Sequence, residues 1–143
     1  MKLFQIEEPE GAPLSADGPG AAVGIELGRD SAAVAISLGG NAEILPAFDG
    51  THRLAILAVQ SLGDLLLDLR AQAEKQLARP VTHAVIATDG NQVRPALDAA
   101  AAKAGIAILR VVTRSEASAK AGGGPDATAL GAAKLAEDLA PQA

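Results

Sequence analysis

Residues 22–37, AVGIELGRDSAAVAIS, contain two short apolar runs that are separated by a tight, glycine-containing turn. The first run, residues 23–27, is β-branched at two positions, and the second, residues 32–38, alternates well enough for a half-buried strand. We therefore predict a strand, a turn and a second strand. Because this arrangement opens many phosphate-binding domains, the turn is either a phosphate cradle or only the tip of a hairpin. Its residues are Gly28, Arg29, Asp30 and Ser31.

The composition favours an aliphatic core inside a single domain. The chain has 143 residues, which is long enough for an ordinary core. Hydrophobic residues make up 49% of it and aromatic residues only 1%, with no Trp or Tyr. The core must therefore be built from Ala, Val, Ile and Leu, which suits layers of helices and strands.

Charge and cysteine content exclude several classes of function. The formal net charge of -5 removes the electrostatic basis for binding nucleic acid or an anionic membrane. The absence of Cys excludes disulfides, thiolate metal sites and cysteine nucleophiles. No signal-like segment opens the chain, and no run approaches the ~18 apolar residues of a membrane span. We therefore expect a cytoplasmic protein that binds neither nucleic acid nor membranes.

The first half of the chain predicts a leader followed by an antiparallel sheet. Residues 1–20 are rich in Pro, Gly and acidic residues, so we expect a flexible leader before a single domain at residues 21–143. The turn signal Gly39-Gly40-Asn41 predicts a third antiparallel strand at residues 42–46. Residues 54–59 are either a fourth short strand or a continuation of the third.

The second half predicts alternating helices and strands. Leucines at spacings of three and four indicate a helix that Ser61 and Asp64 cap and that Pro80 stops. The later expected elements are a strand at 81–88, a helix from Asn91 or Gln92 to Gly105, a strand at 106–112, a short helix at 115–121 and a helix at 127–139 capped by Asp126. The two later strands should lie parallel, joined by a right-handed crossover.

Several segments together resemble one protein family. Residues 23–31, VGIELGRDS, resemble the opening phosphate motif GIDLGTTNS of the seventy-kilodalton heat-shock chaperones. Residues 84–116 resemble that family's segment from VITVPAYF to LEVLRIINEPT, and residues 126–139 are similar to its DEAVALGAALQAE helix. Residues 3–9, LFQIEEP, resemble the LLQISEP start of the iron-sulfur-assembly, HscA-like branch. The segments cover most of the chain in family order.

The resemblance implies a fold and a degenerate site. The fold is α/β, a single ribonuclease H-like or actin-like ATPase lobe, with a mixed five-stranded sheet of three antiparallel strands followed by parallel strands, and with helices on both faces. The family's magnesium-organising Asp becomes Glu26, its two phosphate-loop threonines become Arg29 and Asp30, and its catalytic Glu becomes Arg114. The catalytic Lys segment, the second phosphate loop and the adenine-binding lobe have no counterpart here.

These departures predict a pseudo-ATPase that is not an enzyme, because phosphoryl transfer depends almost wholly on positioning and charge stabilisation. We expect no catalytic residue, no cofactor and no metal site. The degenerate phosphate site would comprise Glu26, Gly28, Arg29, Asp30 and Ser31. The former cleft, now a solvated or partner-facing surface, would comprise Arg29, Asp30, Arg114 and Glu116. A protein partner or a homodimer is expected, and the resemblance implies iron-sulfur-assembly proteins as partners.

Three alternatives stay open. A residual nucleotide or phosphate binder would complete its cleft by dimerisation. A metal-dependent nuclease would use Glu26 with the turn carboxylates Asp49 and Asp89 to chelate magnesium. A stable domain with no present partner is the third. The two histidines, His52 and His83, have no neighbouring residues at triad or zinc spacing and are read as solvated side chains.

Overall fold

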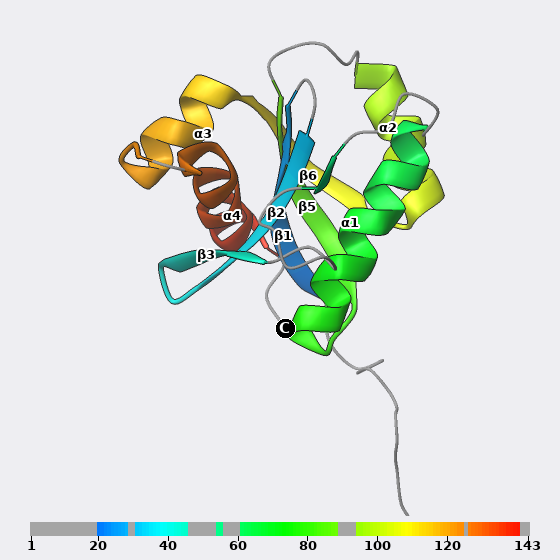
Figure 1. Ribbon diagram of the computed structural model, residues 1–143, viewed down its shortest axis with the longest axis horizontal. Helices are drawn as coiled ribbons and strands as arrows, with labels where there is room; N and C mark the ends of the chain where they lie inside the picture. Colours follow the sequence, from blue (N-terminus) through cyan, green and yellow to red (C-terminus); the bar gives the residue numbers. More distant parts are fainter. Residues whose placement is uncertain are drawn as a thin grey trace, which may run out of the picture.

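A mixed β-sheet runs through the middle of this computed structural model, which describes residues 20–28, 31–45, 54–55, 61–88, 94–124 and 126–140 (Figure 1). The strands are β1 (Ala21–Leu27), β2 (Ser31–Leu38), β3 (Asn41–Leu45), β4 (Leu54–Ala55), β5 (Val81–Thr88) and β6 (Ala107–Thr113). Their order is β3-β2-β1-β5-β6, and β4 pairs with β2 as a short sixth strand. The strands β1, β5 and β6 are parallel, whereas β2 is antiparallel to β1, β3 and β4. The predicted meander and parallel pair are confirmed.

Four helices cover the two faces of the sheet. They are α1 (Leu62–Leu77), α2 (Arg94–Ala104), α3 (Arg114–Ala121) and α4 (Ala127–Leu139). Figure 1 shows α1 and α2 on one side of the sheet and α3 and α4 on the other. Because side chains alternate along a strand, Val23, Ile25 and Leu27 belong to the core under α1 and α2, while the intervening positions of β1 face α3 and α4. The fold is therefore α/β with helices on both faces, as predicted.

The core is aliphatic, and on the α4 side it is built from very small residues. Every buried hydrophobic residue in the described ranges is Ala, Val, Ile or Leu. Two glycines bring α4 close to its neighbours: a Cβ at Gly24 would overlap the backbone of Ala132 and Ala133, and one at Gly131 would overlap the carbonyl of Ala117. These contacts seat α4 directly on β1 and against α3.

Local signals position most helix ends as predicted. Ser61 Oγ accepts a hydrogen bond from the Asp64 amide at 3.1 Å and so caps α1. The helix ends at Leu77, three residues before Pro80, where Ala78 adopts a left-handed conformation with φ 55°. In α2, Gly105 ends the helix with φ 74°, as predicted. The described part of α2 begins at Arg94, so the predicted start at residues 91–92 lies outside the described residues.

The predicted capping of α4 by Asp126 is wrong. Asp126 does precede the helix, but its side chain makes no capping hydrogen bond. The reason lies in its backbone, which has φ 60°, whereas a side-chain N-cap requires an extended conformation. The carboxylate of Asp126 is therefore not used to cap α4.

Glu137 near the end of α4 holds the turn between β2 and β3. Its carboxylate accepts hydrogen bonds from Ser37 Oγ at 2.8 Å and from the amides of Gly39 and Gly40 at 2.6 and 3.0 Å. Both glycines have positive φ, as the tight two-residue turn requires, and this geometry points their N–H groups at the anion. This contact was not predicted from the sequence.

The predicted leader, residues 1–20, lies outside the described residues except for Gly20. In the ranges that the structure does describe, no helix combines the length and the apolar character needed to cross a membrane.

Candidate functional site

The candidate site lies where parallel strands end and α3 and α4 begin. Glu26 is the penultimate residue of β1, and its neighbours across the sheet are Ala33 of β2 and Ala87 of β5. Both neighbours are small, which leaves room for a carboxylate on the face that α4 covers. Arg114 is the first residue of α3 and follows directly on β6. The sheet thus brings together two residues that are 88 positions apart in the chain.

Glu26 and Arg114 form a partly buried ion pair. Arg114 Nη1 donates to Glu26 Oε2 at 2.6 Å. The Glu26 side chain is 3% exposed and the Arg114 side chain is 42% exposed. A carboxylate removed from water is very unfavourable unless it is paired, and a charge-assisted hydrogen bond of this length is among the stronger kinds. Arg114 therefore offsets part of the cost of burying the Glu26 carboxylate.

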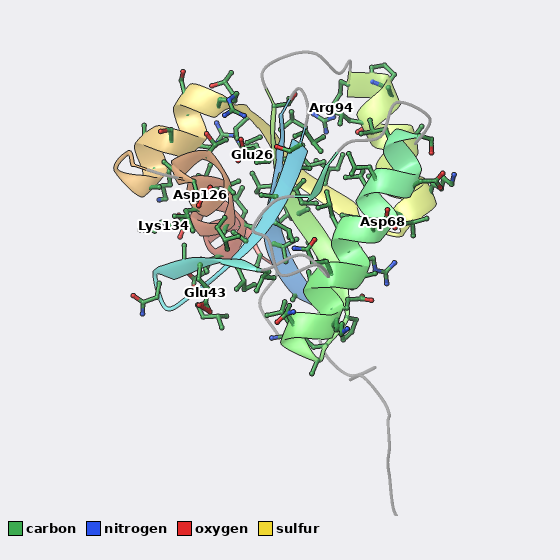
Figure 2. The ribbon with its side chains drawn as sticks, viewed as in Figure 1. Glu26, Glu43, Asp68, Arg94, Asp126 and Lys134 are labelled. Atoms are coloured by element: carbon green, nitrogen blue, oxygen red, sulfur yellow. The ribbon has the colours of Figure 1, made fainter. Side chains whose placement is uncertain are left out.

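A cavity of about 240 Å³ opens beside this pair. It is lined by Glu26, Arg114, Ser118, Gly124, Asp126, Ala127 and Thr128. Figure 2 places Glu26 on β1 and Asp126 at the start of α4. The lining is polar and comes from three elements, so this is a recess between β1, α3 and α4. A second, more open depression of about 520 Å³ shares Arg114, Ser118 and Thr128 with it.

Thr128 and Ser118 also line the cavity, although neither was predicted as a site residue. Thr128 is 9% exposed, yet its hydroxyl makes no hydrogen bond within the described part of the chain. Neither residue stands out in the sequence, because Ser and Thr on helices are common, and only the seating of α4 places them at the cavity.

The predicted phosphate turn is described only at its two ends. The Gly28 amide donates to the Ser31 carbonyl at 2.9 Å, which closes the hairpin between β1 and β2. Arg29 and Asp30 lie outside the described residues, so the predicted phosphate cradle is not tested.

Glu116, predicted to lie on the same face as Arg114, has a local structural role. Its carboxylate accepts from the Thr113 amide at 3.2 Å, while the Glu116 amide donates to Thr113 Oγ1 at 3.0 Å. These reciprocal bonds form a capping box at the start of α3. Glu116 also pairs with Arg110 at 3.3 Å, and it does not line the cavity.

Of the three carboxylates in the magnesium-nuclease alternative, only Glu26 lies in the described residues. Asp49, Asp89 and His52 lie outside the described residues. Among the residues that are described, no group of three or more His, Cys, Asp or Glu side chains is arranged to hold a metal ion. His83 is occupied locally, with Nδ1 at 2.7 Å from Thr82 Oγ1.

Comparisons with known proteins identify no relative. No protein-family model matches the chain, and no curated protein matches it.

Proposed function

We propose that this chain is a noncatalytic binding or scaffold protein built on a degenerate chaperone ATPase lobe. The observation that carries the proposal is the ion pair between Glu26 and Arg114. The resemblance gives these two positions to carboxylates that serve a magnesium-dependent reaction. Here one of them is a guanidinium that already neutralises the other at 2.6 Å, so a metal ion would have to displace Arg114.

The strand order supports the lobe assignment within this proposal. Leaving out the short β4, three antiparallel strands lie in the order β3-β2-β1 and are followed by the parallel strands β5 and β6. This is the order of a ribonuclease H-like half of an actin-like ATPase. Helices on both faces are the second feature that the resemblance implies.

The charges of the cavity argue against phosphoryl transfer. Catalysis of that reaction needs several cationic groups around the developing charge on the phosphoryl oxygens. Among the described residues that line it, the cavity has one guanidinium, which is paired with Glu26, and two carboxylates, Glu26 and Asp126. A polyphosphate entering this cavity would therefore meet more negative than positive charge.

In this proposal the face of α3 and the adjoining cleft bind a protein, either a second copy or another partner. The resemblance of the leader to the HscA-like branch makes iron-sulfur-assembly proteins the first partners to test. The alternative is a residual nucleotide or phosphate binder that completes its cleft by dimerisation. It is favoured by Arg114, whose side chain is 42% exposed and uses only one N–H group in its pair with Glu26.

Light scattering and a phosphate-release assay test the proposal on the purified full chain. We expect no ATP hydrolysis above a protein-free control, and the same mass with and without ATP and Mg²⁺. Magnesium-dependent hydrolysis that is lost in Glu26→Gln would overturn the noncatalytic proposal. A dimer that forms only with nucleotide would instead support the alternative.

A further inference from the structure

Four polar side chains around the cavity have hydrogen-bonding groups that the described chain does not use. Arg114 uses only Nη1, in its bond to Glu26, although a guanidinium has five N–H groups. Asp126 makes neither a cap nor an ion pair with a described residue. The hydroxyls of Ser118 and Thr128 also have no described partner. Buried or half-buried groups of this kind indicate a site for a polar ligand.

Thr128 is the sharpest of these observations. Thr128 is only 9% exposed, and it lines both the cavity and the adjoining depression. It is the second residue of α4, where backbone N–H groups of the first turn lack partners inside the helix. Asp126, Ala127 and Thr128 at the start of α4 all line this cavity.

The volume limits the size of the ligand. About 240 Å³ is below the ~300–1,000 Å³ of pockets that hold drug-sized molecules. The cavity adjoins an open depression of about 520 Å³ with which it shares Arg114, Ser118 and Thr128, so the limit applies to the enclosed part alone. A molecule of a few heavy atoms would fit inside it.

The charge arrangement selects the type of ligand. A dianionic phosphate would lie between Glu26 and Asp126, and a divalent cation would meet the guanidinium that holds Glu26. A ligand with one positive and one negative group satisfies both kinds of side chain at once. We propose that the recess between β1, α3 and α4 binds a small zwitterion of the α-amino-acid type.

Each end of this ligand has its partners in the recess. The ligand carboxylate accepts from the unused N–H groups of Arg114, from the Thr128 hydroxyl and from the start of α4, where the helix dipole favours an anion. The ligand ammonium donates to the carboxylate of Asp126. Glu26 stays paired with Arg114 and orients the guanidinium. The proposal goes beyond the proposed function and does not depend on it.

The test is a titration of the ¹⁵N-labelled full chain, followed by amide chemical shifts. The probes are glycine, L-alanine and L-serine. The comparison compounds are acetate, methylammonium, inorganic phosphate and MgCl₂. We expect saturable shifts at Gly124 and Thr128 with at least one amino acid, and affinities for acetate and methylammonium that are about tenfold to a hundredfold weaker.

Two substitutions separate binding from folding. Asp126→Asn removes the charge, while Asn tolerates the left-handed backbone at this position, so the fold is kept. Thr128→Val removes the hydroxyl with little change in shape. Each should weaken amino-acid binding by about tenfold. Asp138→Asn, whose carboxylate pairs with Lys120 outside the cavity, is the matched control and should bind normally.

The proposal is overturned if no amino acid shifts the cavity amides, or if Asp126→Asn and Thr128→Val bind as tightly as the unmodified chain. Phosphate or magnesium binding at the same amides, in place of the amino acids, would overturn it as well. Amide spectra of each variant without ligand verify that it is folded. A parallel titration with ATP tests the proposed function separately from amino-acid binding.

Discussion

Glu26 is nearly fully buried, and its carboxylate accepts a hydrogen bond from the Arg114 guanidinium. Breaking a buried pair by removing one partner costs about 3–5 kcal/mol, whereas exposed pairs contribute ~0–1 kcal/mol. With Glu26 3% exposed and Arg114 42% exposed, the pair lies between these limits. Glu26 and Arg114 therefore act as one unit, and neither is expected to tolerate change alone.

Arg114→Gln should lower the free energy of unfolding by about 1–3 kcal/mol, because it removes the charge-assisted hydrogen bond that Arg114 donates at 2.6 Å to the nearly buried Glu26 carboxylate. The double substitution Glu26→Gln with Arg114→Gln should recover most of that loss, because no uncompensated charge remains. Urea unfolding followed by far-ultraviolet circular dichroism measures both, since the chain has no Trp or Tyr to report by fluorescence. Strictly additive effects of the two single substitutions would show that the side chains are not coupled.

Gly24 makes a second prediction at the scale of the residue. Gly24→Ala should destabilise the protein by about 1–3 kcal/mol, because the new methyl group overlaps the backbone of α4 rather than a mobile side chain. Gly63→Ala is the matched control. Its Cβ would meet only the flexible side chain of Lys103, and Ala favours a helix over Gly by ~1 kcal/mol. Equal losses from both substitutions in urea unfolding would contradict the close seating of α4.

At the scale of elements, α4 connects the two ends of the sheet. Its first turn borders the cavity, and Glu137 near its last turn holds the hairpin between β2 and β3. The hydrogen bond from Ser37, followed by that from the Gly40 amide, lowers the pKa of Glu137 from its ordinary value of 4.5. A lowered pKa means that the folded state favours the charged carboxylate. The contact therefore stabilises the fold above pH 4.5 and is lost as the pH falls through the lowered pKa.

Glu137→Gln should be less stable than the unmodified chain at pH 7, and the difference should shrink as the pH falls below 4.5. The measurement is the urea midpoint at a series of pH values between ~7 and ~3, read by circular dichroism. Glu43→Gln is the matched control, because the exposed side chain of Glu43 on β3 makes no hydrogen bond or ion pair with a described residue. A gap between Glu137→Gln and the unmodified chain that stays constant with pH would mean that the charge of Glu137 does not hold the hairpin.

At the scale of the whole molecule, the parts that could be predicted are those that local chemistry decides. Ser61 starts α1, Gly39 and Gly40 make a two-residue turn, and Gly105 ends α2, because each residue type suits one backbone conformation. The alternation of residues 32–38 predicted a half-buried strand, and this was wrong: successive residues of β2 are buried, because helices cover both faces of the sheet.

The candidate site could be predicted only in part. Glu26 and Arg114 were each expected at the cleft, but their pairing depends on strand order and on the start of α3. Thr128 is at the cavity because Gly24 and Gly131 seat α4 closely, a contact between distant segments. Asp126 followed the rule for a helix cap, yet its left-handed backbone gave it another environment. Tertiary packing determines each of these placements, and no local sequence pattern predicts it.

The central proposal is that Arg114 occupies the position of a cation in this cleft, so that the cleft binds neither nucleotide nor a metal ion. Thermal unfolding of the full chain, followed by circular dichroism with and without millimolar ATP and Mg²⁺, tests this claim most directly. The account predicts the same midpoint in both conditions. A rise in the midpoint that requires ATP and Mg²⁺ together, and that saturates with concentration, would contradict it.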